Sequence, residues 1–328
     1  MLNIYGFDFT DPANIGWTGG TFSRETSTVR NGTHSYKGTG TLASATSPSF
    51  GNKGTIYAGI AVYWQSVASA AKCIGFVDGS TLQVCVTIET DGTLKVRRGT
   101  ESGTVLCSSS SGVFTVNTWH HLQLYCVVHG SAGAVELRLN GTNVASASGI
   151  NTSNTGNAYA NKFAMYGCAG FNYAYYDDLW ISDTAFQGDC KVETIYPSAN
   201  GTTNNFNVSG AASNYLCVDE TGDYNSDTDY TYDANVGDKD LFAMGNLATV
   251  SGTVKGVRIN TVMRKDDTGT KQAAMVVRNA GVESVRTTNT LTTTYTVYQE
   301  DLTTDPTSGS AWSIATVNSV EIGAKVIT

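Results

Sequence analysis

Charged residues and proline are both scarce in this chain of 328 residues. Asp, Glu, Lys and Arg make up 15% of the sequence, and there are only 4 prolines. The 20 basic and 28 acidic residues give a net charge of −8. Such a chain has no general attraction to phosphate backbones, so we expect no nucleic-acid partner. No stretch approaches the ~20 apolar residues of a membrane span, so we also expect no membrane insertion.

Targeting and metal-binding motifs are missing as well. The first residues, MLNIYGFDF, contain no basic segment followed by an apolar one, so we expect no signal peptide and synthesis in a cytoplasm. The seven cysteines are widely spaced and form no C-x-x-C pair, which predicts reduced, inert thiols. The adjacent His120 and His121 would point to opposite faces of a strand, so they cannot bind one metal ion together. We expect no metal-binding residue.

Short segments of alternating apolar residues are abundant, and glycine is frequent, with 35 residues. Apolar residues alternate over 82–88 and resume at Leu94 and Val96. A three-residue loop, 90–92, would pair residue 88 with 94 and residue 86 with 96, with Gly92 in the left-handed position that this loop needs. Because Gly, Ser, Thr and Asn are poor helix formers, the sequence predicts an all-β chain with almost no helix.

The strand pattern of the first part of the chain ends near residue 188, and a stretch rich in Ser, Asn, Gly and Thr runs from Pro197 to about Asn205. Strand-like segments continue beyond it to the end of the chain, and many short strands at this spacing are typical of sandwiches. We therefore expect two β-sandwich (jelly-roll) domains. The first would cover residues 1–188 and the second residues 206–328, with a linker over residues 189–205.

Four segments of the first domain resemble the concanavalin A-like jelly rolls of the laminin-G type. They are TDGTLKVRRG (90–99), NTWHHLQL (117–124), ELRLNGTNVA (136–145) and YDDLWIS (176–182). The second domain resembles a module that recurs in tailed-phage structural proteins. That resemblance rests on NYLCVDE (214–220), GDKDLF (237–242), GTVKGV (252–257), RKDDTG (264–269) and TDPTSGSAW (304–312). It implies a bacteriophage virion protein.

Catalysis by paired carboxylates is not predicted. Jelly-roll glycosidases carry Glu-x-Asp-x-x-Glu on one strand, because one carboxyl group donates a proton while another attacks or stabilises. Glu89 and Asp91 match the first half, but Leu94 stands where the second Glu is needed. Asp91 also lies in the predicted turn, and no Gly-x-Ser-x-Gly motif is present. We expect no catalytic residue and no enzymatic activity.

Two groups of aromatic residues are candidates for binding. Tyr224, Tyr230 and Tyr232 lie in the acidic stretch 219–240 and suit a protein contact surface. The same stretch could bind calcium, but as an EF-hand loop it has Thr228 in place of Gly and Ala234 in place of Glu. A solvated acidic loop without a cofactor is the favoured reading.

The second group precedes the closing strand of the first domain. Its members are candidates for a glycan-facing surface, because C–H groups of sugar rings pack on aromatic rings, although alternating aromatic residues also fill cores. These candidates are Tyr166, Phe171, Tyr173 and Tyr175.

The expected function is that of a non-enzymatic structural protein on the surface of a tailed-phage virion, as a capsid decoration or a tail-associated component. Its partners would be other virion proteins and further copies of itself, such as a trimer. The alternative is an adhesin for host attachment, whose jelly roll binds a host surface polysaccharide. A polysaccharide-degrading enzyme is the least favoured reading. The expected location is the virion, after synthesis in the host cytoplasm.

Overall fold

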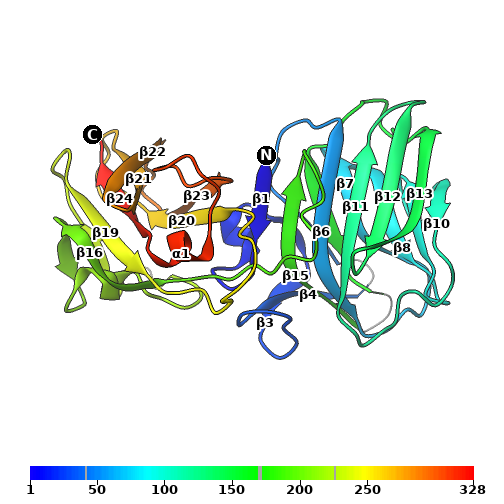
Figure 1. The fold of residues 1–328 in the computed structure, drawn as a ribbon, viewed down its shortest axis with the longest axis horizontal. Helices are drawn as coiled ribbons and strands as arrows, with labels where there is room; N and C mark the ends of the chain where they lie inside the picture. The colour runs from blue at the N-terminus through cyan, green and yellow to red at the C-terminus, as the bar shows by residue number, and fades with distance from the viewer. Residues whose placement is uncertain (41–42, 169–171, 225–226) are drawn as a thin grey trace. The chain divides into compact units, whose positions relative to one another are not determined.

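The computed structural model describes residues 1–40, 43–168, 172–224 and 227–328. The chain forms two compact units, Met1–Val192 and Glu193–Thr328, and both consist of antiparallel sheets (Figure 1). Helical structure in the described ranges is limited to the 3₁₀ turns Pro12–Ile15 (η1) and Asn214–Cys217 (η2) and the short α1 (Ile314–Asn318). The predicted all-β fold is confirmed. No helix in these ranges is long and apolar enough to cross a membrane.

The first unit contains an eight-stranded sheet, in the order β13-β12-β11-β6-β15-β4-β3, with β1 paired to β15. Its strands are β1 (Leu2–Tyr5), β3 (Phe22–Glu25), β4 (Ser35–Thr39), β6 (Thr55–Trp64), β11 (His120–Val127), β12 (Gly133–Leu139), β13 (Thr142–Ile150) and β15 (Tyr173–Ser182).

A seven-stranded sheet packs against it in the order β10-β9-β8-β7-β14-β5-β2. Its strands are β2 (Thr18–Gly20), β5 (Ser44–Thr46), β7 (Ala71–Asp78), β8 (Thr81–Ile88), β9 (Leu94–Arg98), β10 (Val105–Ser108) and β14 (Lys162–Tyr166). The β8–β9 hairpin has the predicted register, with Ile88 opposite Leu94 and Val86 opposite Val96. Gly92 takes the left-handed conformation, with φ of +76°.

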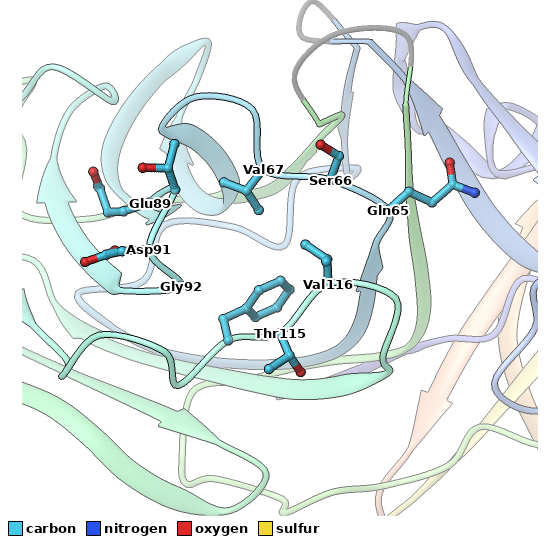
Figure 2. Close-up of a pocket in the computed structure, with 10 residues that line it drawn as sticks. Gln65, Ser66, Val67, Glu89, Asp91, Gly92, Thr115 and Val116 are labelled. Carbon is cyan, nitrogen blue, oxygen red and sulfur yellow. The ribbon is translucent and has the colours of Figure 1, made fainter.

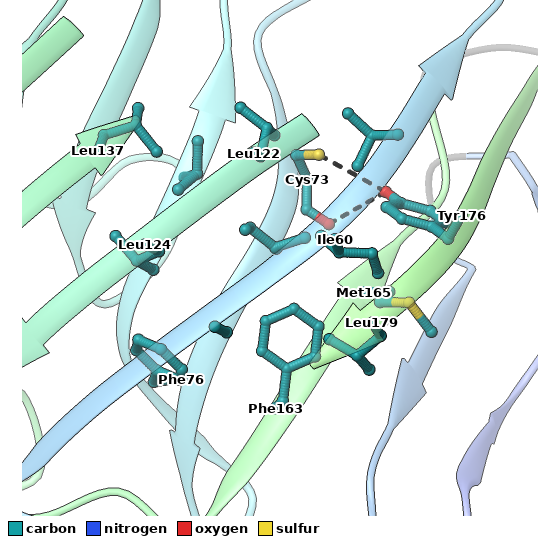
Figure 3. Packing of buried hydrophobic residues seen from close by; sticks show 14 of the residues in the cluster. Ile60, Cys73, Phe76, Leu122, Leu124, Leu137, Phe163, Met165, Tyr176 and Leu179 are labelled. Atoms are coloured by element: carbon teal, nitrogen blue, oxygen red, sulfur yellow. Dashed lines mark hydrogen bonds between the residues drawn. The ribbon is translucent and has the colours of Figure 1, made fainter. Parts of the chain in front are cut away.

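The core of the first unit lies between these two sheets (Figure 3). Ile60, Leu122 and Phe163 come from different strands and are fully buried, and each such side chain stabilises the fold by about 1.5–3 kcal/mol. Tyr176 is also fully buried, and its hydroxyl donates a hydrogen bond of 3.1 Å to the Cys73 carbonyl oxygen. Tyr176 therefore belongs to the core, as the alternating pattern of β15 requires.

Residues 183–192, here called the strap, follow β15 and run back over the outer face of the eight-stranded sheet. Phe186 packs on Tyr57 with ring centroids 5.0 Å apart. Further along, the Gly188 carbonyl accepts a hydrogen bond from the Trp180 indole. Asp189 then pairs with Arg30. The strap thus covers the Tyr57 end of β6 and its middle.

The second unit is built around a five-stranded sheet, in the order β16-β19-β24-β21-β22. Its strands are β16 (Pro197–Asn204), β19 (Lys239–Met244), β21 (Gln272–Asn279), β22 (Val282–Thr290) and β24 (Glu321–Val326). Two ribbons complete it, namely β17 (Asn207–Ser209) with β18 (Tyr230–Tyr232), and β20 (Val257–Met263) with β23 (Thr296–Leu302). Met275 of β21, Ile259 of β20 and Trp312 share its core.

The stretch 189–205 does not form a free linker. Residues 189–192 belong to the strap of the first unit, while Pro197–Asn204 forms the edge strand β16 of the second unit. The polar composition that suggested a linker reflects an exposed edge strand, since polar side chains suit a strand with one unpaired side.

Candidate functional site

The outer face of the eight-stranded sheet carries the candidate site. Side chains of a strand alternate between two faces, and the even-numbered residues of β6 from Ile56 to Trp64 belong to the core. The odd-numbered residues Gly59, Ala61 and Tyr63 therefore project outward. Beyond Ala61 the strap no longer follows β6, and aromatic side chains stand in its place.

Four aromatic residues form a line at this end of the face, here called the aromatic row. They are Trp119, Tyr63, Tyr175 and Tyr173. Ring centroids lie 5.6 Å apart for Trp119 and Tyr63, 5.7 Å for Tyr63 and Tyr175, and 6.2 Å for Tyr175 and Tyr173. Tyr175 is 4% exposed, and the other three are partly exposed. The row thus presents partly exposed ring faces and edges from three of its four residues, with Tyr175 packed between Tyr63 and Tyr173.

Polar groups border the aromatic row. The Lys37 ammonium lies 5.1 Å from the Tyr173 ring centroid and is also bound to Glu25 at 2.5 Å. The hydrogen bond from Lys37 lowers the pKa of Glu25 to about 2. On the other side, the Gln65 amide donates to the Tyr175 hydroxyl at 3.4 Å. The row thus combines ring surfaces with amide, ammonium and hydroxyl groups.

The aromatic candidates of the first domain separate in the structure. Tyr173 and Tyr175 belong to the row, as two outward positions of β15. Tyr166 lies on β14 of the other sheet, where Lys72 stands 4.9 Å from its ring centroid. Phe171 lies outside the described residues.

Sequence reasoning missed Tyr63 and Trp119. A usable signal was the alternation of β6, because Tyr63 is out of phase with the apolar residues that fill the core. Trp119 has no such signal, because it immediately precedes β11 and only strand pairing brings it beside Tyr63.

A pocket of about 500 Å³ opens beside the row (Figure 2). It is lined by Gln65, Ser66, Val67, Glu89, Thr90, Asp91, Gly92, Phe114, Thr115 and Val116. Figure 2 shows Glu89 and Asp91 on one side of the pocket and Gln65 on the other. Gln65 thus lines the pocket and also bonds the row, so the two surfaces are adjacent.

The two carboxylates of this pocket are both stabilised in the ionised form. Partial burial raises the pKa of Glu89, but a hydrogen bond from Arg97 and the charge of Lys95 outweigh it, and the net pKa is lowered. The pKa of Asp91 is lowered because its carboxylate accepts the Thr93 backbone N–H. Ionised carboxylates accept hydrogen bonds from ligand hydroxyl groups.

The tyrosines of the acidic stretch do not form one surface with each other. Tyr230 and Tyr232 lie together on β18, with centroids 5.8 Å apart, and Tyr232 is 52% exposed. Tyr224 contacts Tyr295 instead, also at 5.8 Å. The Tyr295 hydroxyl donates to Asp227, which ties the stretch to the segment just before β23.

No group of three or more His, Cys, Asp and Glu side chains within the described ranges could hold a metal ion. His120 packs beside Phe114 at 4.7 Å and bonds Thr115, whereas His121 lies under the strap. The two histidines therefore face apart, as their adjacent positions on a strand require.

The cysteines are free. Burial raises the pKa of Cys73, Cys85 and Cys126 to about 12. These three are therefore protonated and poor nucleophiles at neutral pH.

Comparison with known proteins gives structural likenesses only. No family model matches the chain, and no curated protein matches it. Among solved structures, the alginate lyase Aly36B has 15% identity and a TM-score of 0.39, with 57% of this chain and 98% of that chain covered. The alginate lyase vAL-1 from Chlorella virus has 14% identity and a TM-score of 0.39, covering 52% and 93%. Domain 4 of the arabinanase AbnA from Geobacillus stearothermophilus has 16% identity and a TM-score of 0.35, covering 56% and 82%.

One expectation is corrected by these likenesses. We expected a protein without enzymatic activity, but the matched structures include alginate lyases and a sialidase of Trypanosoma rangeli, which are enzymes. The sequence lacks a carboxylate pair, a histidine cluster and a nucleophile motif. General acid–base catalysis also uses Tyr and Lys. The absence of those three motifs therefore does not rule out catalysis.

Proposed function

We propose that the first unit binds a polysaccharide along the aromatic row. The observation that supports this is the line of four aromatic side chains on the outer face of the sheet, with polar groups beside it. Apolar C–H faces of sugar rings pack on aromatic rings, while sugar hydroxyls need hydrogen-bond partners. The row and the amide and ammonium groups around it meet both needs.

The row is not required to complete the core. The core of the unit lies on the opposite face of β6 and β15, and it contains Val62 and Tyr176 but none of the four row residues. Three of the four remain partly exposed. Aromatic side chains that gather on a surface without filling a core are typical of binding sites.

A screen of immobilised polysaccharides tests the proposal, with wild type compared to Trp119→Ala. We expect the variant to bind at least tenfold more weakly, which corresponds to about 1.4 kcal/mol. Tyr125→Ala is the matched control, because Tyr125 is an aromatic residue on the outer face of the same sheet but contacts Phe186 of the strap. The control should bind no more weakly than wild type does.

The proposal fails if Trp119→Ala and Tyr125→Ala bind equally well to every polysaccharide that binds the wild-type protein. Circular dichroism of both variants shows whether each is folded. A second row variant, Tyr63→Ala, should repeat the loss seen with Trp119→Ala, because their rings are in contact at 5.6 Å.

We also propose that the setting of this binding is a phage particle, as the sequence resemblance implies. Polysaccharide binding by a virion protein would serve attachment to a host surface. Mass spectrometry of purified particles tests the location, and gel filtration of the protein tests the expected homo-oligomer. Detection only outside particles would contradict the virion proposal without affecting the binding proposal.

A further inference from the structure

Unpartnered polar groups lie buried on the outer face of the eight-stranded sheet, and one of them, His121, lies next to Asp189 of the strap. Both ring nitrogens of His121 and the Gln123 amide oxygen are buried and have no hydrogen-bond partner in the described part of the chain. His121 is 1% exposed, as is Gln123. An unsatisfied buried polar group is destabilising, and such groups in a folded protein call for an explanation.

These groups lie in register with the middle of the outer face. His121 and Asp177 both pair with Ala61, on opposite sides of β6, and Gln123 pairs with Gly59. Because position 59 is glycine and position 61 is alanine, other groups fill the space above the middle of β6. Trp180 fills it over Gly59, where its ring would lie 2.3 Å from an added Cβ atom.

Over Ala61 the strap presents a carboxylate. Asp189 Oδ1 lies 2.5 Å from Arg30 Nη2 and 4.0 Å from His121 Nε2. The Asp189 side chain is 44% exposed, whereas those of Arg30 and His121 are 18% and 0% exposed. A partly exposed carboxylate thus reaches a partly buried guanidinium and a fully buried imidazole from the solvent side, as the carboxylate of a bound ligand would.

The charges around Arg30 do not depend on Asp189 alone. Arg30 Nη1 binds Asp178 at 2.8 Å, and its backbone N–H donates to Asp177 at 3.0 Å. A β-bulge between residues 177 and 180 turns both aspartates toward Arg30. Asp178 also accepts the Val192 N–H. If Asp189 leaves, Arg30 keeps its position through Asp178 and gains an open hydrogen-bonding edge.

We propose that the strap is a built-in pseudo-ligand, in which Asp189 takes the place of the carboxylate of an acidic sugar residue. Release of the strap would open a subsite formed by Arg30, His121 and Gln123. Arg30 would bind a carboxylate, and neutral His121 and the Gln123 amide would bind hydroxyl groups. The ligand class is a polyuronate. This inference rests on the proposed function, because the same polysaccharide would occupy both surfaces.

The subsite continues directly into the aromatic row. On β15, Tyr175 lies two residues before Asp177, and on β6, Tyr63 lies two residues after Ala61, so each pair shares the outer face. Trp119 likewise lies two residues before His121. A polysaccharide bound on the row would reach the strap with its next sugar units.

Asp189→Asn tests the proposal, because it keeps the size of the side chain and removes the charge that binds Arg30. The probes are polygalacturonate and its methyl ester, which differ only in the carboxylate. Calorimetry measures the binding of each. We expect Asp189→Asn to bind polygalacturonate about five- to tenfold more tightly than wild type, with no gain for the methyl ester. Alginate and glucuronan provide the same comparison for other uronic acids.

Asp183→Asn is the matched control, because Asp183 lies at the start of the strap but pairs with Lys53 and the N-terminal amine. It should leave both affinities unchanged. Hydrogen exchange of the backbone amides of 186–191 should be faster in Asp189→Asn than in the control. If exchange is unchanged, Phe186→Ala/Asp189→Asn removes a second contact of the strap, and the comparison is repeated with that variant.

Three results would overturn the inference. One is a released strap with no gain for any polyuronate, and another is an equal gain for the methyl ester. The third is a gain in Asp189→Asn that persists when Arg30→Gln is added. If neutral polysaccharides bind through Trp119 and no uronate effect appears, only this inference fails. If Trp119→Ala binds all polysaccharides as wild type does, the proposed function fails first.

Discussion

The outer face of the eight-stranded sheet carries an aromatic cluster at each end, and the strap covers only one of the two. At one end Tyr57 and Tyr125 stack at 4.7 Å, and the strap covers them with Phe186, on which Arg138 lies at 4.1 Å. At the other end the aromatic row has no such cover from the strap. Among the described residues, the strap thus covers one aromatic cluster, while three rings of the row stay partly exposed. This contrast supports the proposal that the row binds an external ligand.

The largest effect is expected at Gly59 of β6, which is covered by the ring of Trp180 of β15. Gly59→Ala places a methyl group 2.3 Å from the ring of Trp180, which is 2% exposed and bonded to Gly188. We expect the free energy of unfolding of the first unit to fall by about 2–3 kcal/mol, as overpacking does. Urea unfolding measures it. Gly130→Ala is the control, because nothing lies within 4 Å of its added Cβ, and a fall of equal size there would refute the packing argument.

A pH effect of about 2 kcal/mol is expected from His121. Burial lowers the pKa of His121 to about 4, with the nearby Arg30 also lowering it and Asp189 opposing the shift. In the unfolded chain histidine binds a proton below about pH 6.5. The contribution of neutral His121 is therefore present above pH 6.5 and is lost as the pH falls toward 4.

His121→Leu should remove this dependence. Between pH 7 and pH 4.5 the wild type should lose about 2 kcal/mol more unfolding free energy than the variant. Urea unfolding at the two pH values measures the difference. Equal losses in both proteins would show that His121 is not buried in its neutral form, and the strap would then not cover it in solution.

A smaller effect on the free energy of unfolding is expected from the contrast between the end of the sheet that Phe186 covers and the aromatic row. Phe186→Ala removes ring contacts with Tyr57 and Tyr125 and the contact with Arg138, and we expect a loss of about 1 kcal/mol. Tyr173→Ala in the open row should change stability by less than about 0.5 kcal/mol, since it is partly exposed. Thermal unfolding compares them. A larger loss for Tyr173→Ala would mean that the row is structural.

Local pattern was sufficient for part of this fold. The β8–β9 register followed from alternating apolar residues and from Gly92 in the turn. Tyr173 and Tyr175 were recognised as candidates because aromatic residues cluster in a short segment of the sequence. In each case the interacting residues lie within about ten positions of one another, so the physical constraint is visible in the sequence.

The rest depends on contacts between distant segments. Tyr63 meets Tyr175 only because β6 pairs with β15, and no local feature connects them. Residues 189–192 of the strap have no hydrophobic period, and they were expected to be part of a linker over residues 189–205. Its position is set by Arg30, which binds Asp178 and Asp189 about 150 residues later. Long-range electrostatic contacts of this kind leave no periodic signal.

The most direct test of the central claim is a crystal structure of the protein with an oligosaccharide that it binds in the screen. The account predicts a sugar ring in van der Waals contact with Tyr63 or Trp119 and a hydroxyl group within hydrogen-bond distance of Gln65. A sugar bound elsewhere on either unit, with the aromatic row uncovered, would contradict it.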